Sequence, residues 1–172
     1  MKTLPSKDDI DQASQVIKFY SNVGFLPEKL FLAIAKSSVT ATAELVAFVE
    51  KPEGLHVVVT QRPDDDPNWP GYWHVPGKVI RPTDSEGSLS DALSRAAEDE
   101  LGGAAIKSGP HEYKTVFNQV KRGAELTVYH WAVLKKEPAT GKTVPIDKLP
   151  EPFVKHQYKL VSSAVTQYEK DK

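Results

Sequence analysis

One segment, residues 88–101, constrains the fold more than any other, because its beginning, its buried face and its end are all marked in the sequence. Ser88 suits a helix N-cap, Asp91 follows three residues later as an imperfect capping-box partner, and Gly102 suits the position after a helix. The apolar residues between them recur at helical spacing and form one stripe: Leu89, Ala92, Leu93, Ala96, Ala97 and Leu101. The segment is predicted to be an amphipathic helix.

Glu100 interrupts this stripe, because it lies four residues after Ala96 and three after Ala97. A carboxylate directed at a core must be paired or must bind a cation, since an isolated buried charge is costly. Asp99 lies beside it, and two adjacent acids at the edge of a buried face suit magnesium or manganese, which prefer oxygen ligands. The other interpretation is that Glu100 reaches out to solvent. The helix alone leaves both open.

The composition narrows the classes of protein. A chain of 172 residues has the size of one ordinary domain, and 22 Lys and Arg against 23 Asp and Glu give a net charge of −1. A general nucleic-acid or membrane-surface binder would carry a basic excess, so neither partner is expected. There is no cysteine, and the first residues do not resemble a signal peptide. A cytoplasmic protein is the natural interpretation.

Helical and strand patterns alternate along the chain. Residues 8–36 predict one or two helices, with Ser6 as a cap and Pro27 in the first turn of the second. Strands are predicted at 45–49, 55–59, 72–75, 113–120 and 125–135, and a last helix at about 152–169. Helices among strands that include a hairpin predict an α+β fold with a mixed sheet.

Two short motifs fall in a family order. Tyr72-Trp-His-Val-Pro-Gly77 is followed, after a spacer, by Arg95-x-x-x-Asp99-Glu100-x-Gly102, and this arrangement resembles the Nudix hydrolase family. The family pattern is a Trp-x-Leu-Pro-Gly-Gly strand end, then Gly-x5-Glu-x7-Arg-Glu-U-x-Glu-Glu-x-Gly-U, where U is aliphatic. The resemblance implies a Nudix fold, a mixed sheet sandwiched between helices (α/β/α), over 41–172. Residues 1–40 would be a helical extension packed on that domain.

The resemblance also implies a chemistry. Family members use magnesium to hydrolyse a nucleoside diphosphate linked to another group, because the metal neutralises the diphosphate and activates water. Carried over, it assigns catalytic roles to Glu100, Asp99 and Arg95. It assigns Mg²⁺ or Mn²⁺ ligands to Gly77, Asp99, Glu100 and Glu86. Substrate contacts fall to Arg62, Lys78, Tyr72 and Trp69.

Several positions depart from the family pattern. Lys78 replaces the second glycine, the first signature glutamate falls on Gly87 with Glu86 one place out of register, and Ala96 replaces the glutamate after the arginine. The spacer before Arg95 is also three residues longer than the family pattern. Losing the carboxylate at Ala96 removes the group best placed to share a metal with Glu100. Metal binding is therefore expected to be weak.

Three functions remain open on the sequence. The first is a magnesium-dependent hydrolase, whose replacement base could be His111, Glu112 or Glu125. The second is a catalytically weak or inactive Nudix-fold module that binds a nucleotide or a protein. The third resembles the GDP-mannose mannosyl hydrolases, which also lack the glutamate at the position of Ala96. A homodimer is compatible with each function, and the N-terminal helices could supply the surface that contacts the second copy or another partner.

Overall fold

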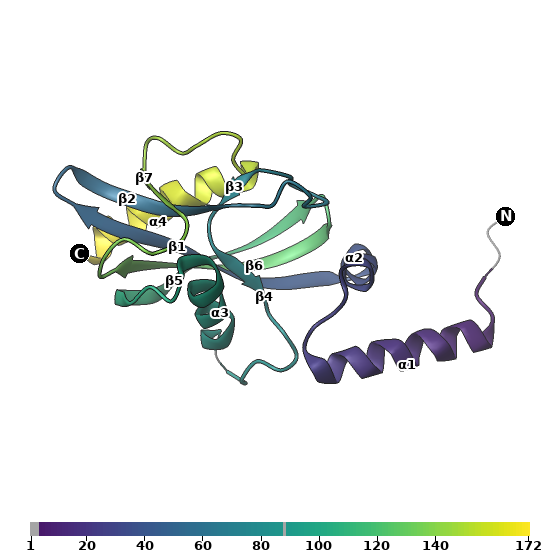
Figure 1. Cartoon of the computed structure of the whole chain (residues 1–172). Coiled ribbons are helices and arrows are strands. Elements are labelled where there is room, and N and C mark those ends of the chain that lie inside the picture. The colour runs from purple at the N-terminus through teal and green to yellow at the C-terminus, as the bar shows by residue number, and fades with distance from the viewer. Residues whose placement is uncertain (1–3, 88) are drawn as a thin grey trace.

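The computed structural model describes residues 4–87 and 89–172 (Figure 1). In chain order the elements are α1 (Lys7–Val23), α2 (Glu28–Ser37), β1 (Val39–Lys51), β2 (Gly54–Gln61), β3 (Trp73–His74), β4 (Gly77–Val79), α3 (Ser90–Leu101), β5 (Ile106–Val120), β6 (Gly123–Leu134), β7 (Lys142–Pro145), the 3-10 turn η1 (Lys155–Gln157) and α4 (Tyr158–Asp171). The predicted α+β class is confirmed.

A mixed sheet forms the centre of the domain. Its main path runs β3-β2-β1-β6-β5, with β4 paired to β1 and β7 paired to β2. Strands β1 and β6 are parallel from Val39↔Ala124 to Phe48↔Val133, whereas the neighbouring pairs are antiparallel. A parallel pair at the centre is covered on both faces, which explains why residues 45–49 are apolar without alternation.

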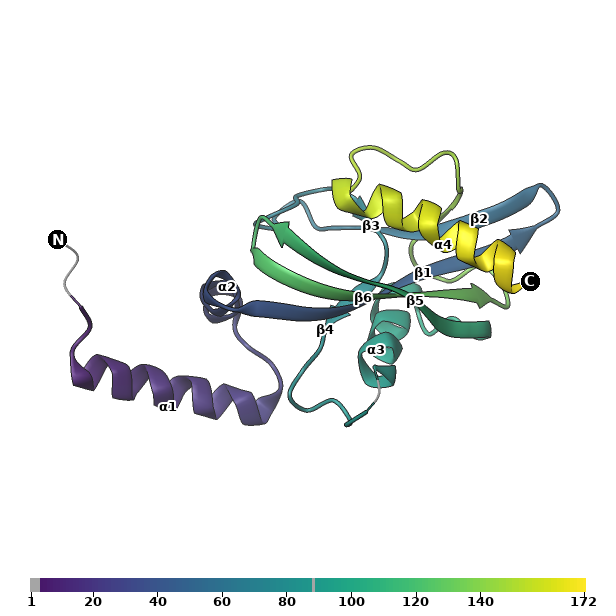
Figure 2. The same cartoon turned by 180° about the vertical axis from the view of Figure 1, so that it is seen from behind.

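Helices α3 and α4 lie on opposite faces of this sheet (Figures 1 and 2). Leu45 packs in one apolar cluster with Leu93 and Leu101 of α3. Phe48 packs in the other with Val161 of α4. Alternate side chains of β1 thus point to two separate cores, and this confirms the predicted α/β/α sandwich.

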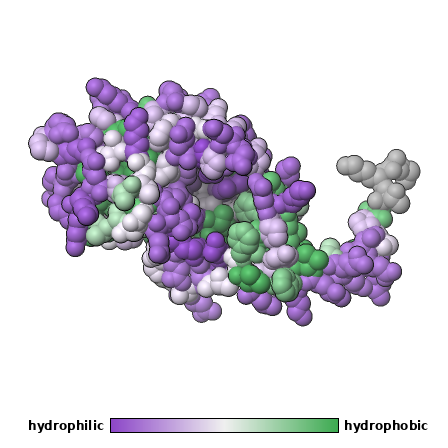
Figure 3. Space-filling model, viewed as in Figure 1, coloured by the Kyte–Doolittle hydropathy of each residue, from purple (hydrophilic) through white to green (hydrophobic). Residues whose placement is uncertain are grey.

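The N-terminal helices differ in their contact with the domain. Helix α1 begins with the expected cap, since the Asp9 N–H donates to Ser6 Oγ and Ser6 N–H donates to the Asp9 carboxylate. Helix α2 contacts β1 and β6, whereas α1 extends from the domain and has no buried residue (Figure 1). Apolar residues gather around α2 and its junction with α1 (Figure 3). The division at residues 40 and 41 stays a prediction.

The structure sharpens the element boundaries. Helix α3 begins at Ser90 after Leu89, and the predicted N-cap Ser88 lies outside the described residues. Asp91 accepts hydrogen bonds from Ser85 N–H and Oγ–H. The last helix begins at Tyr158, six residues later than predicted. The short strands β4 and β7 have no prediction, because they carry too few residues for a periodic pattern. Of the helices in residues 4–87 and 89–172, none combines the length and the apolar composition that a membrane span requires.

Candidate functional site

A cavity of about 580 Å³ opens where β4 and the last turn of α3 meet β1 and β2. Its volume lies within the range of small-molecule sites, about 300–1,000 Å³. The polar and charged lining residues are Thr42, Glu44, Thr60, Gln61, Arg62, His74, Lys78, Arg81, Asp99, Glu100, Arg122 and Thr140. The structure therefore gathers side chains from most of the domain at one place.

Gly77 sets the position of the cavity wall. It pairs with Glu44 across β4 and β1, and a Cβ at Gly77 would lie 2.6 Å from Glu44 Cγ. Only a glycine allows β4 to approach β1 this closely. Lys78 follows at once and pairs with Ala43, so the register directs its side chain toward the end of α3. The Pro76-Gly77 motif thus places a lysine at the centre of the site.

Lys78 lies between the two acids that end α3. Its Nζ is 3.2 Å from Asp99 Oδ2 and 3.1 Å from Glu100 Oε1. The Glu100 side chain is 15% exposed and that of Asp99 58% exposed, so Glu100 forms the inner part of this cluster. Glu100 therefore neither reaches freely into solvent nor stays unpaired. Its charge is balanced by an ammonium group from the neighbouring strand.

Glu100 has three further polar neighbours, because the Gly77 N–H donates to its Oε1 at 3.4 Å and Thr60 and His74 lie beside its Oε2. Thr60 Oγ1 lies 3.1 Å from Glu100 Oε2 and 3.1 Å from His74 Nε2. Burial, with Arg62 and Lys78 nearby, lowers the pKa of His74 to about 3. The ring is therefore neutral at pH 7, and Nδ1–H donates to the Val75 carbonyl at 2.8 Å. Nε2 is left as an acceptor, so His74 contributes polarity to this wall but no charge.

A third carboxyl group, that of Glu44, lies deeper in the cavity. Glu44 is 8% exposed, and Gln157 Nε2 donates to its Oε2 at 2.6 Å. Burial raises the pKa of Glu44 to about 8, with the negative charge of Glu125 as the next cause. Arg122, Gln157 and Arg62 act in the opposite direction. Glu44 is thus largely protonated at neutral pH.

Arg95 lies on the side of α3 that faces away from the cavity, where it has a structural role. Its guanidinium pairs with Asp84, where Nη2 lies 3.0 Å from Oδ2, and it also donates to the Val79 carbonyl at 3.0 Å. This hydrogen bonding holds the pKa of Asp84 below its ordinary value. Arg95 is not among the residues that line the cavity. It ties the loop before α3 to the end of β4.

The predicted substrate residues separate into two groups. Arg62 and Lys78 line the cavity, whereas Trp69 and Tyr72 do not. Trp69 is buried, its backbone N–H donates to Asp66 Oδ1 at 2.7 Å, and the Arg62 guanidinium lies 5.2 Å from its ring centre. Tyr72 carries Lys121 Nζ over its ring at 5.8 Å. The structure thus places Trp69 as a support for Arg62.

The remaining sequence candidates lie elsewhere. Glu86 is exposed in the loop before α3 and does not line the cavity. His111 and Glu112 are exposed on the edge strand β5. Glu125 is buried and ion-paired with Arg122, behind the cavity wall. None of these lines the cavity.

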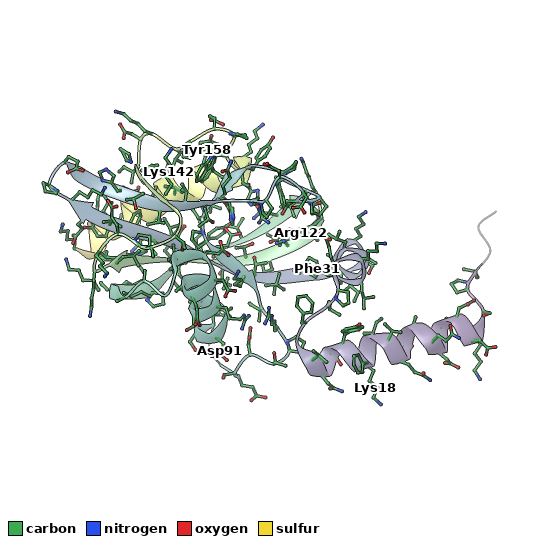
Figure 4. The ribbon with its side chains drawn as sticks, in the orientation of Figure 1. Lys18, Phe31, Asp91, Arg122, Lys142 and Tyr158 are labelled. Atoms are coloured by element: carbon green, nitrogen blue, oxygen red, sulfur yellow. The ribbon has the colours of Figure 1, made fainter. Side chains whose placement is uncertain are left out.

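Sequence reasoning missed three lining residues that bear on its chemistry: Glu44, Arg81 and Arg122. Glu44 carried a usable signal, because it precedes an apolar strand and shares the face of Val46 and Phe48. Arg122 belongs to the β5–β6 turn, and Figure 4 shows it beside Phe31 of α2, with 5.8 Å from Cζ to the ring centre. No local pattern indicates that this turn reaches the cavity.

The resemblance to the Nudix hydrolases predicts a divalent metal, but the donors at the predicted position do not fit one. Within residues 4–87 and 89–172, no group of three His, Asp or Glu side chains could hold a metal ion. Ala96 is fully buried and supplies no carboxylate one turn before Glu100. The two acids that remain, Asp99 and Glu100, are bridged by Lys78. Two carboxylates that already share an ammonium are a poor site for Mg²⁺.

Comparison with known proteins identifies the fold. No protein-family model matches the sequence, and no curated protein matches it significantly. Solved structures do match. The NUDIX domain of Shewanella oneidensis NrtR, complexed with ADP ribose, aligns with 83% of this chain and 99% of its own at 24% identity and a TM-score of 0.59.

Two further structures agree. A mutT/nudix family protein from Listeria innocua covers 77% of this chain and 95% of its own, at 17% identity and a TM-score of 0.61. The C. elegans Ap4A hydrolase covers 76% and 99%, at 15% identity and a TM-score of 0.56. The chain therefore has the Nudix fold.

Proposed function

We propose that this chain binds a nucleoside diphosphate linked to another group, with the phosphates in the cavity. One observation carries the proposal: four basic side chains line the cavity, and only two charged acids oppose them at neutral pH. The basic residues are Arg62, Lys78, Arg81 and Arg122. The charged acids are Asp99 and Glu100, because Glu44 is largely protonated.

Arg81 is the most available of these cations. Arg62 pairs with Asp66 and Arg122 with Glu125, both outside the cavity lining. Among the described residues, no carboxylate forms an ion pair with the Arg81 guanidinium, whose charge contributes at longer range to the lowered pKa of Asp84. A planar guanidinium that faces a cavity suits two oxygens of one phosphate. The NrtR domain, complexed with ADP ribose, shows that this fold accommodates a ligand of the proposed class.

Calorimetric titration of the purified chain tests the proposal with ADP ribose, GDP-mannose and diadenosine tetraphosphate, and with adenosine as the phosphate-free control. At least one phosphate compound is expected to bind, and adenosine is not. Arg81→Ala should weaken that binding about tenfold, the loss of one charge-assisted contact. Lys136→Ala, an exposed lysine outside the cavity, is the matched control. If no phosphate compound binds, or if adenosine binds equally well, the proposal is wrong.

Magnesium-dependent hydrolysis of such a compound is the second candidate. The observation in its favour is the position of Asp99 and Glu100 on the cavity wall beside Gly77, where the resemblance places metal-binding acids, and this function requires the ion to displace Lys78 from them. The assay incubates the same compounds with Mg²⁺ or Mn²⁺ and identifies the products. Cleavage between phosphates releases a nucleoside monophosphate, whereas a glycosyl hydrolase would release GDP and free mannose. Glu100→Gln should abolish turnover, and Glu98→Gln on the exposed face of α3 should not.

A further inference from the structure

Lys78 occupies the position that a divalent cation would need. A metal held by this site would lie between the carboxylates of Asp99 and Glu100, and the Lys78 Nζ lies there at 3.2 and 3.1 Å from them. The side chain is 24% exposed and is fixed at its base by the pairing of β4 with β1. The ammonium group is therefore held in a fixed position in the cavity wall.

We propose that Lys78 is a permanent cation that replaces the metal, so that the cavity binds the diphosphate of a nucleotide without a divalent ion. The inference rests on the proposed function. An ammonium has three N–H donors, of which two are directed at Asp99 and Glu100. The third is available to a phosphate oxygen in the cavity. Lys78 thus joins the acids to the ligand, as a bound metal would.

The loss of the glutamate at the position of Ala96 is consistent with the replacement of a metal ion by Lys78. At Ala96, one turn before Glu100 on α3, the family's negative charge is missing, and at Lys78, on the contacting strand β4, a positive charge is gained. An Mg²⁺ ion would have to displace the ammonium and would then find only two carboxylates. The ammonium needs only these two partners. The donor set present therefore matches a lysine better than a metal.

The same geometry gives the site a preference among ligands. The Arg81 guanidinium lines the same cavity as Lys78. Two cations in one cavity suit a diphosphate, whose two phosphates can contact one cation each. A single phosphate would use only one of them. ADP is therefore expected to bind more tightly than AMP, because it gains a second charge-assisted contact of about 1.5–3 kcal/mol, roughly tenfold or more in affinity.

The experiment uses ADP as the probe, with AMP for comparison, and titrates each into the full chain in EDTA and in MgCl₂. The variants are Lys78→Met, which keeps the length and removes the charge, and Lys78→Arg, which keeps the charge. Circular dichroism confirms that each is folded. Wild type should bind ADP in EDTA, without improvement in magnesium. Lys78→Met should bind ADP about tenfold more weakly in EDTA, Lys78→Arg should retain most of the affinity, and Lys136→Met should match wild type.

A separate titration follows Mn²⁺ alone by electron paramagnetic resonance. Wild type should not bind Mn²⁺ at about millimolar concentration, the weak end of oxygen-ligand sites. Lys78→Met frees Asp99 and Glu100 and should bind it more tightly, and adding Glu100→Gln should remove that gain. Wild-type binding of Mn²⁺ equal to that of Lys78→Met, or ADP binding that requires magnesium, would overturn the inference. If neither wild type nor any variant binds ADP in either buffer, the inference is overturned, whereas the proposed function is decided separately by the titrations with ADP ribose, GDP-mannose and diadenosine tetraphosphate. The Mn²⁺ result would still show whether Lys78 excludes the metal.

Discussion

Two glutamates on β1 face the same side of the sheet and have opposite properties. Glu44 and Glu50 are six residues apart, and both accept hydrogen bonds from the C-terminal segment, Glu44 from Gln157 and Glu50 from Tyr168. Burial raises the pKa of Glu44 to about 8. Hydrogen bonds from Lys107, Tyr168 and Lys172 lower the pKa of Glu50 to about 2.

The difference shows that one strand can carry a charged glutamate and a nearly neutral one. Near the C-terminal end of β1, Glu50 is charged, and its carboxylate accepts hydrogen bonds from Tyr168 and Lys172 at the end of α4. At its middle, β1 keeps Glu44 nearly neutral beside the cavity, where a third negative charge would oppose a phosphate. The residue type is the same in both places. Its charge at neutral pH depends on how far the carboxyl group is exposed to solvent and on how many hydrogen-bond donors it faces. Three predictions test this contrast, from the largest expected effect to the smallest.

Replacing Glu44 by Gln should remove a pH dependence of stability. In the folded chain Glu44 keeps a proton that the unfolded chain releases above pH 4.5, so the wild-type free energy of unfolding should fall as the pH rises toward 8. One proton gives up to about 1.4 kcal/mol per pH unit, or on the order of 3 kcal/mol from pH 5.5 to 8. Denaturant titrations at several pH values measure it. Glu112→Gln, exposed on β5, is the control, and parallel profiles for wild type and Glu44→Gln would contradict the assignment.

Removing the amide at Gln157 should destabilise the fold at neutral pH. Its Oε1 accepts from Val75 N–H at 3.0 Å while its Nε2 donates to Glu44. Gln157→Leu leaves both partners buried without a hydrogen bond, which costs about 2 kcal/mol. Urea unfolding at pH 7 measures the loss, with the exposed Gln12→Leu in α1 as control. A change no larger than that of the control would show that the Gln157 bridge adds nothing to stability.

Glu50→Gln should have the smallest effect. The Glu50 side chain is 32% exposed, so solvent screens its pairs with Lys107 and Lys172, and less than about 1 kcal/mol is expected. Because its pKa is lowered, this contribution is present above pH 4.5 and is lost as the pH falls toward 2. Thermal unfolding in low and high salt tests it, and Glu98→Gln is the control. A loss that does not shrink in salt would mean that Glu50 acts through packing.

The sequence predicted the fold well where its patterns are long. The apolar runs of β1 and β2 and the stripe of α3 predicted the α+β class, and the resemblance of the two motifs predicted the Nudix fold that the structure shows. Arg62, Lys78, Asp99 and Glu100 were also predicted at the site, and all four line the cavity. The other lining residues Thr60, Arg81 and Arg122 were not predictable, because they come from ordinary strand ends and turns. Only the folded chain brings such positions together.

What the sequence determined by itself is therefore the set of local signals: caps, periodicity, a glycine where two strands approach, and a carboxylate on an apolar stripe. What the tertiary structure decided is the charge of each group at the site. Lys78 became the counter-ion of Asp99 and Glu100 because β4 lies against α3, and Glu44 became nearly neutral because it is buried in the fold near the negative charge of Glu125. The charge state of a group depends on its burial and on its distance from other charges, which come from elements far apart in the chain. The spacing of residues in the sequence predicts neither.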